Sequence, residues 1–204
     1  MSDVERLTDL PMCVPQLPAQ ERGDAVRNRA LLLDAARRLV AERGADAVTM
    51  DDVAAAAGVG KGTLFRRFGS RARLMMVLLD EDERASQQAF LFGPPPLGPG
   101  APPADRLVAF GRERIRFAHD HCELLSAANR DPRNRHNAPA MVLRTHVRVL
   151  LKAADSTGDL DAQTDALLAL LDTDYVEHQL HERGHTLTTL GDAWESLARK
   201  LCGR

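Results

Sequence analysis

The stretch with the most chemistry in this sequence is AGVGKGTLFRRFGS, residues 57–70. It places glycine, lysine, glycine and threonine in succession from Gly60 to Thr63, and then sets two arginines between two phenylalanines. Glycines beside a lysine and a hydroxyl can form a loop that holds a nucleotide phosphate. On a short helix, the same residue types can contact the phosphates and base edges of a nucleic acid.

The nucleotide-binding alternative requires the pattern G-x-x-x-x-G-K-[ST] after a buried strand. Gly60 and Lys61 supply only the central pair of this pattern. Its first glycine would fall at Ala55 and its hydroxyl at Gly62. The preceding residues, MDDVAAAA, favour a helix rather than a strand. The sequence therefore argues against a phosphate loop.

A helix-turn-helix fits the same stretch better. It consists of two short helices joined by a turn of three or four residues that contains glycine. The pattern predicts a first helix over 50–57, a turn at 58–60 and a second helix over 61–68. Apolar residues on the inner side of both helices can pack on a preceding amphipathic helix. Lys61, Thr63, Arg66 and Arg67 then face outward, as DNA contacts require.

Residues 31–75, LLLDAARRLVAERGADAVTMDDVAAAAGVGKGTLFRRFGSRARLM, closely resemble the DNA-binding domain of the TetR family of bacterial transcriptional regulators. The apolar positions and Gly44, Thr49, Gly58 and the Lys61–Leu64 run keep their relative spacing. The resemblance implies a three-helix head, a long fourth helix, and a helical body that binds a small molecule and pairs with a second subunit.

The resemblance also assigns roles to individual residues. Thr49, Lys61, Thr63 and Arg71 would contact phosphate, and the DNA backbone would come close at Gly60 and Gly62. Phe65 stands where relatives usually have a tyrosine, and Arg67 stands where they often have a histidine. The full set of expected DNA-binding residues is Thr49, Gly60, Lys61, Gly62, Thr63, Leu64, Phe65, Arg66, Arg67 and Arg71.

Charge is distributed unevenly along the chain. Residues 22–75 hold eleven Lys and Arg against six Asp and Glu, whereas residues 76–204 hold fifteen against nineteen. The first twenty-one residues hold one against four, and the whole chain has a formal net charge of −2. A basic segment in an otherwise acidic chain indicates that one part meets a polyanion.

The hydrophobic pattern predicts an all-α protein. Residues 1–24 contain three prolines, show no periodicity and are expected to form a flexible N-terminal arm. Residues 25–70 are expected to form the helix-turn-helix domain, with helical periodicity starting at Arg27. Residues 71–204 are expected to form the body. Its predicted helices cover 71–90, 105–119, 123–129, 139–154, 161–182 and 187–202, with a loop over 93–103.

The last two predicted helices are candidates for pairing with a second copy of the chain. Residues 159–180 carry leucines on more than one face, so this segment should be buried on several sides. Two such helices can form a four-helix bundle with their symmetry mates. A twofold homodimer of this kind would present its two recognition helices ~34–36 Å apart, to a palindromic operator in double-stranded DNA.

The body should also hold the small-molecule effector, whose identity the sequence leaves open. Aromatic and polar residues of its central helices are candidate ligand contacts. Core filling is the competing interpretation for the phenylalanines and the methionine, and solvation for the arginines. The candidates are Phe110, Arg114, Phe117, Met141, Arg144, His146, Tyr175 and His178.

Two other classes of function are alternatives to a ligand-responsive DNA-binding regulator. A metal- or redox-sensing regulator could use His178, His181 and His185, or the HDHCE segment over 119–123. An enzyme could use Cys122 beside His119, but the glycine-rich turn of a nucleophile is missing there. The spacing favours neither, so no metal site, cofactor or catalytic residue is expected.

The sequence as a whole thus predicts a DNA-binding regulator, most simply a repressor that a small molecule releases or retunes. No apolar run approaches the ~18–20 residues that a membrane span needs. The acidic N-terminus lacks the features of a signal peptide. A cytoplasmic protein with no membrane partner is therefore expected.

Overall fold

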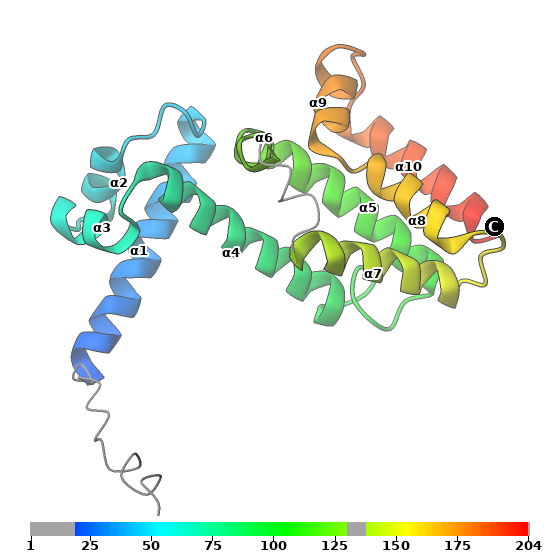
Figure 1. The fold of residues 1–204 in the computed structure, drawn as a ribbon, viewed down its shortest axis with the longest axis horizontal. Coiled ribbons are helices and arrows are strands. Elements are labelled where there is room, and N and C mark those ends of the chain that lie inside the picture. The colour runs from blue at the N-terminus through cyan, green and yellow to red at the C-terminus, as the bar shows by residue number, and fades with distance from the viewer. Residues whose placement is uncertain (1–18, 130–137, 204) are drawn as a thin grey trace, which may run out of the picture.

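The computed structural model describes residues 19–129 and 138–203, and all regular secondary structure in these residues is helical (Figure 1). The prediction of an all-α protein is therefore confirmed. The helices of the N-terminal part are α1 (Ala19–Arg43), α2 (Met50–Ala57), α3 (Lys61–Phe68) and α4 (Arg71–Phe92). Those of the C-terminal part are α5 (Pro103–Asp120), α6 (Cys122–Asn129), α7 (Ala138–Ala153), α8 (Leu160–Ala169), α9 (Thr173–His181) and α10 (Leu187–Leu201).

Helices α1, α2 and α3 form a small head with its own core. Leu64 and Phe68 of α3 are buried against apolar residues of α1 and α2 and of the first turns of α4. Val53 and Ala54 of α2 are buried in the same core. The small side chain of Ala54 lets α2 approach the neighbouring helices closely. Burying a leucine or phenylalanine side chain contributes about 1.5–3 kcal/mol, so these contacts fix the orientation of α3.

The predicted ends of the two short helices are confirmed. Thr49 caps α2, since its hydroxyl accepts from the amide of Asp52 at 3.1 Å while the Asp52 carboxylate accepts from the amide of Thr49. Gly58 ends α2 with φ of 64°, a left-handed conformation that favours glycine. The amide of the next residue, Val59, donates back to the Ala54 carbonyl at 3.0 Å. These bonds set the angle between α2 and α3.

Helix α4 runs from the head into the body (Figure 1). Ser70 caps its start by accepting from the amide of Arg73. Leu74 and Leu78 lie in the core of the head, whereas Phe90 lies in the core of the body. The helix has 22 residues, and a helix of that length spans about 33 Å.

The body is built around α5, which packs against α10, α7 and α9. Trp194 of α10 is 2 % exposed, and its indole N–H donates to the Leu107 carbonyl of α5 at 2.9 Å. Gly111 of α5 lies under the Trp194 ring, and a Cβ there would come within 1.8 Å of a ring carbon. The absence of a side chain at Gly111 thus allows α10 to lie directly on α5.

Three predicted boundaries differ from the structure. α1 begins at Ala19, earlier than the periodicity from Arg27 indicated, and residues 1–18 of the predicted arm lie outside the described residues. α5 begins at Pro103, the position where proline suits a helix start. The single helix predicted over 161–182 is wrong. It is two helices, α8 and α9, because the carboxylate of Asp172 accepts from the amide of Asp174 and starts a new helix.

Within the described residues, no helix is both long enough and apolar enough to cross a membrane.

His146 of α7 lies in the body core and cannot easily be protonated. Its ring is 6 % exposed and lies 4.5 Å from the Phe90 ring and 5.0 Å from the Phe110 ring, between centroids. Its Nε2 atom is buried with no hydrogen-bond partner. Burial, followed by the charge of Arg106, lowers its pKa to about 4. His146 is thus a neutral core residue at neutral pH.

This histidine makes the free energy of unfolding depend on pH. The unfolded chain takes up a proton at His146 near pH 6.5 but the folded chain only near pH 4, so stability falls as the pH drops through this interval. We expect a loss of about 2 kcal/mol between pH 7 and pH 5 from this group. Urea titrations of the wild type and His146→Leu at both pH values measure it, since the variant should lose less stability on acidification. His178→Gln, at an exposed position, should behave like the wild type. An equal acid loss in His146→Leu would contradict the assignment.

Candidate functional site

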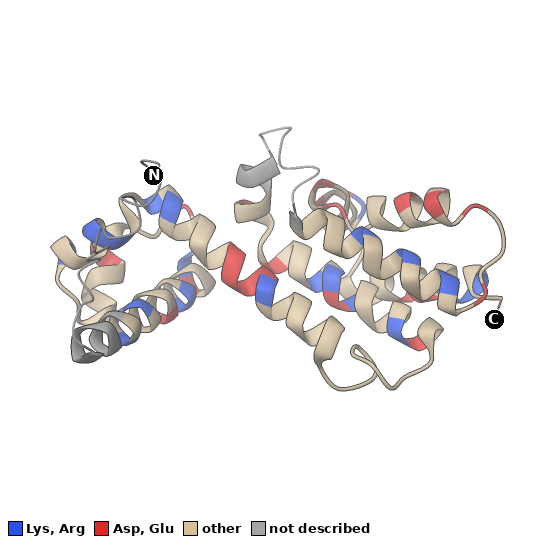
Figure 2. Cartoon of the chain, turned by 60° about the horizontal axis from the view of Figure 1, so that its bottom comes forward, with Lys and Arg blue, Asp and Glu red and all other residues tan. Residues whose placement is uncertain are grey.

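Helix α3 exposes one basic side and buries the other. Leu64 and Phe68 are turned into the head, at 0 % and 3 % exposure. Thr63 is partly buried, and Phe65 is 46 % exposed although it is a large apolar side chain. The exposed residues of this helix are Lys61, Gly62, Phe65, Arg66 and Arg67. Figure 2 shows Lys and Arg on the helices of the head, and both signs of charge along the body.

Leu64 was predicted as a DNA-binding residue, and the structure corrects this. Its side chain is fully buried in the core of the head, so it cannot reach a ligand in solvent. It holds α3 in place instead. The neighbouring predicted residues, Lys61 and Arg66, project from the other side of the helix.

The start of α3 is shaped to accept an anion. Gly60 precedes the helix in extended conformation, and no side chain caps the first amides of α3. Added Cβ atoms at Gly60 and Gly62 would meet no atom within 4 Å. Uncapped amides at a helix N-terminus bind phosphate well. Lys61 stands beside them and is ion-paired with Asp51 of α2, with both side chains more than half exposed.

Two predicted phosphate contacts have internal partners. The Thr49 hydroxyl donates to the Asp52 carboxylate at 2.6 Å, within the cap of α2. The Arg71 guanidinium donates to the Val48 carbonyl at 2.8 Å and also to the Ala45 carbonyl. Arg71 therefore holds the start of α4 against the loop between α1 and α2. Its contact with phosphate stays a prediction.

The body contains an open cavity of about 850 Å³ between α4, α5, α7, α8 and α9. Four of the eight predicted ligand residues line it, namely Arg114, Met141, Arg144 and Tyr175. Apolar walls come from Met76, Leu79, Ala118, Leu125, Leu143, Leu168 and Leu171. The cavity therefore combines apolar walls with charged groups, and small-molecule sites usually combine apolar surface with polar groups.

The other four predicted ligand residues lie elsewhere. Phe110 and Phe117 are core residues at 0 % and 6 % exposure, and neither lines the cavity. His146 is in the core and borders only a smaller hollow of about 260 Å³ between α4 and α7. His178 is half exposed on α9, beside Glu182. These residues alternate with the lining ones along the same helices, so the sequence pattern could not separate them.

The carboxylates of the cavity were not among the predicted ligand residues. Glu83 of α4 is 9 % exposed and accepts from Arg114 at 2.9 Å. The Arg114 guanidinium also lies 4.1 Å from the centre of the Phe117 ring. Four aspartates, Asp80, Asp165, Asp172 and Asp174, complete the acidic part of the lining. No spacing pattern marks them in the sequence, because they come from three separate segments, α4, α8 and the start of α9.

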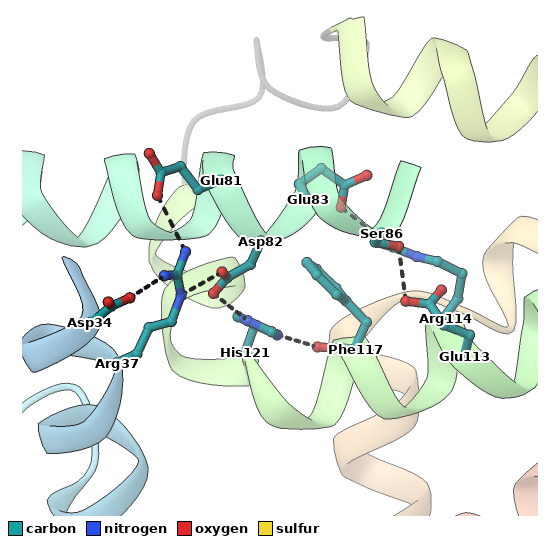
Figure 3. A network of polar contacts seen from close by, with 10 residues as sticks. All are labelled: Asp34, Arg37, Glu81, Asp82, Glu83, Ser86, Glu113, Arg114, Phe117 and His121. Carbon is teal, nitrogen blue, oxygen red and sulfur yellow. Dashed lines mark hydrogen bonds and ion pairs between the residues drawn. The ribbon is translucent and has the colours of Figure 1, made fainter. Parts of the chain in front are cut away.

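The head meets the body at a cluster of charges around Asp82 of α4 (Figure 3). Asp82 accepts from Arg37 of α1 at 2.8 Å and from His121, at the end of α5, at 3.1 Å. Glu81 also pairs with Arg37, at 3.3 Å. A second contact lies nearby, where the Glu123 carboxylate of α6 accepts from the Ala45 amide at 2.6 Å.

His121 is a cation at this junction. Its Nδ1 atom lies 3.0 Å from the Phe117 carbonyl and its Nε2 atom lies 3.1 Å from the Asp82 carboxylate. Both oxygens can only accept, so both ring nitrogens donate, which requires the protonated ring. Burial by itself would lower the pKa of His121, but the hydrogen bonds to Asp82 and to the Phe117 carbonyl raise it overall. Burial by itself would raise the pKa of Asp82, but the hydrogen bonds from His121 and Arg37 lower it overall.

Neither a metal site nor an activated thiol is formed by the candidate residues. Among the described residues, no three His, Cys, Asp or Glu side chains are arranged to hold a metal ion. His119 and His181 both contact Glu177. Burial and the nearby charge of Glu177 raise the pKa of Cys122, so its thiol is less reactive than an ordinary cysteine.

Comparisons with known proteins agree with this geometry. Residues 32–76 match the family model described as bacterial regulatory proteins, tetR family. An HTH-type transcriptional regulator of Staphylococcus aureus is 33 % identical over 61 residues, which are 30 % of this chain and 33 % of that protein. This chain thus aligns with only a third of the length of that relative.

Solved structures share the fold over most of the chain. A Saccharomonospora viridis protein crystallised with choline has a TM-score of 0.69 at 18 % identity, covering 85 % of this chain and 96 % of that one. A TetR-family transcriptional regulator from Streptomyces coelicolor has a TM-score of 0.59 at 18 % identity, covering 92 % and 96 %. The head therefore matches the model of the TetR family, and the chain shares the fold of these solved structures over most of its length.

Proposed function

We propose that the chain is a DNA-binding transcriptional regulator that acts as a homodimer and responds to a small molecule. The observation that carries the proposal is the exposed basic side of α3, fixed on a helix-turn-helix by buried Leu64 and Phe68. It lies within residues 32–76, which match the family model. Binding represses transcription, and the operator is a palindrome read by two heads.

In this proposal α3 enters the major groove. The uncapped amides at its start and Lys61 contact phosphate. Arg66 and Arg67, in the last turn of the helix, provide paired donors for phosphate or for guanine. Phe65 offers no hydroxyl to phosphate, but its exposed ring can contact sugar or a thymine methyl group.

The homodimer forms through the C-terminal helices α8 and α10. Both expose small side chains on the surface that they turn away from the body, which allows close approach of a second pair of helices. The exposed small residues are Ala162 and Ala166 on α8 and Ala193 and Ser196 on α10. A twofold axis through such a bundle places both heads on the same side of the dimer.

The effector occupies the cavity of the body and acts through α4. Met76, Leu79, Asp80 and Glu83 of this helix line the cavity. Asp82 of the same helix pairs with Arg37 of the head. A ligand that displaces α4 would therefore change the direction of the head and the spacing of the two recognition helices. The ligand must bind more tightly to the state that does not fit the operator.

Two variants separate the contribution of Lys61 to DNA binding from that of its ion-pair partner, Asp51. Lys61→Ala should weaken binding to every duplex and lower the slope of log K against log salt by about one, because one phosphate contact is lost. Asp51→Asn breaks the same Lys61–Asp51 pair but keeps the lysine, so it should bind DNA at least as tightly as the wild type. Fluorescence anisotropy over a salt series measures both. Equal weakening in the two variants would mean that the ion pair matters and the phosphate contact does not.

The second prediction concerns Gly62. Its position in α3 has open space for a methyl group, so Gly62→Ala should stabilise the folded chain by up to about 1 kcal/mol. If the DNA backbone approaches this residue, the same methyl group should weaken binding to DNA. Thermal unfolding and anisotropy on one preparation give both values. A more stable variant with unchanged affinity would show that DNA does not approach α3 at this point.

The third prediction tests the junction between head and body. Asp82→Asn leaves two cations, Arg37 and His121, without their shared carboxylate, and should cost about 1–3 kcal/mol of unfolding free energy. Asp34→Asn removes an exposed carboxylate that pairs with the same Arg37, and should cost less than about 0.5 kcal/mol. Urea unfolding at pH 7 compares them. Similar small losses in both would show that the junction contributes little to stability.

A further inference from the structure

The two arginines in the cavity wall are already occupied. Arg114 lies between the Glu83 carboxylate, at 2.9 Å, and the Phe117 ring, at 4.1 Å. It is 7 % exposed and also donates to the Ser86 hydroxyl at 3.1 Å. Arg144 pairs with Asp165 and, at 3.3 Å, with Asp161. An anionic ligand would have to break one of these ion pairs to obtain a counter-charge from the described walls.

Carboxylates, in contrast, are in excess and partly available. Five line the cavity against the two guanidinium groups. Asp80 of α4 and the carboxylate of Asp174, in the first turn of α9, make no ion pair with any described residue. Asp80 stands one helical turn before Glu83, and residues three apart lie on the same side of a helix. A positive charge in the cavity therefore finds counter-charges that need no rearrangement.

The remaining lining defines the rest of the ligand. Leucine and methionine side chains, among them Met76, Leu79, Met141, Leu143 and Leu168, form much of the apolar part of the wall. Tyr175, beside Asp174, is 38 % exposed and borders the same space, where its ring face can contact a cation. We propose that the cavity selects an organic cation, a positively charged group on a bulky apolar body, and excludes the anion of the same shape.

This inference rests on the proposed function, since it names the class of effector for the same cavity. Two ions of nearly equal size and shape test it directly. Tetraphenylphosphonium is the cation and tetraphenylborate is the anion. Isothermal titration of the full chain with each, in sodium buffer, should show one saturable site per chain for the phosphonium, weakening as salt rises. The borate should bind at least tenfold more weakly.

Variants locate the site. Asp80→Asn and Asp174→Asn should each weaken phosphonium binding about two- to fivefold, as loss of one exposed counter-charge does. Asp155→Asn, at a carboxylate after α7 that does not line the cavity, should leave it unchanged. Circular dichroism and thermal unfolding verify that all three variants fold. If the affinity for the phosphonium is unchanged in both cavity variants, the ion binds elsewhere and the proposal is wrong.

Equal or tighter binding of the borate would overturn it as well. Failure of both ions to bind would also reject this class of ligand. DNA binding measured on the same preparation keeps the two proposals apart. A chain that binds DNA but not the phosphonium retains the regulator function and loses only the cation assignment.

Discussion

One helix belongs to two separate hydrophobic cores, and the rest of the structure depends on this. The first turns of α4 place Leu74, Met75 and Leu78 in the core of the head, and its last turns place Phe90 in the core of the body. Between them the backbone is helical without interruption. Any shift of α4 in the body must therefore either move the head or be absorbed where α4 meets α1, because both ends of the helix are packed.

Charges on the middle of α4 divide between these two parts. Asp82 turns to the head and to the end of α5, where Arg37 and His121 share it. Glu83, the next residue, turns to the cavity and holds Arg114. The Phe117 ring connects the two sets, since it lies under Arg114 and stacks on His121 with centroids 4.2 Å apart. Figure 3 shows the two sets of polar contacts, one around Asp82 and one around Arg114, with the Phe117 ring between them.

This arrangement gives a physical meaning to the uneven charge of the chain. The basic excess of residues 22–75 is exposed on the head, where α3 has Lys61, Arg66 and Arg67 at its surface. The acidic excess of the body is found partly in the cavity wall and partly at helix starts. There, the carboxylates of Asp159 and Asp172 accept from the first amides of α8 and α9. At the junction, Glu81 and Asp82 of α4 pair with Arg29 and Arg37 of α1.

The sequence by itself determined the class of fold, the three helices of the head and the cap of α2, because these depend on short-range spacing. Thr49, Asp52 and Gly58 are each within a few residues of the groups they contact. What only the tertiary structure decided depends on residues that are far apart in the chain. The split of α8 from α9 at Asp172, the burial of Leu64, Phe110 and His146, and the excess of carboxylates in the cavity are of this kind. Periodicity shows that one side of a helix is apolar, but it does not show which neighbour covers that side. For the same reason the contacts of Arg71 with the carbonyls of Ala45 and Val48 were not predicted, since these partners are more than twenty residues away.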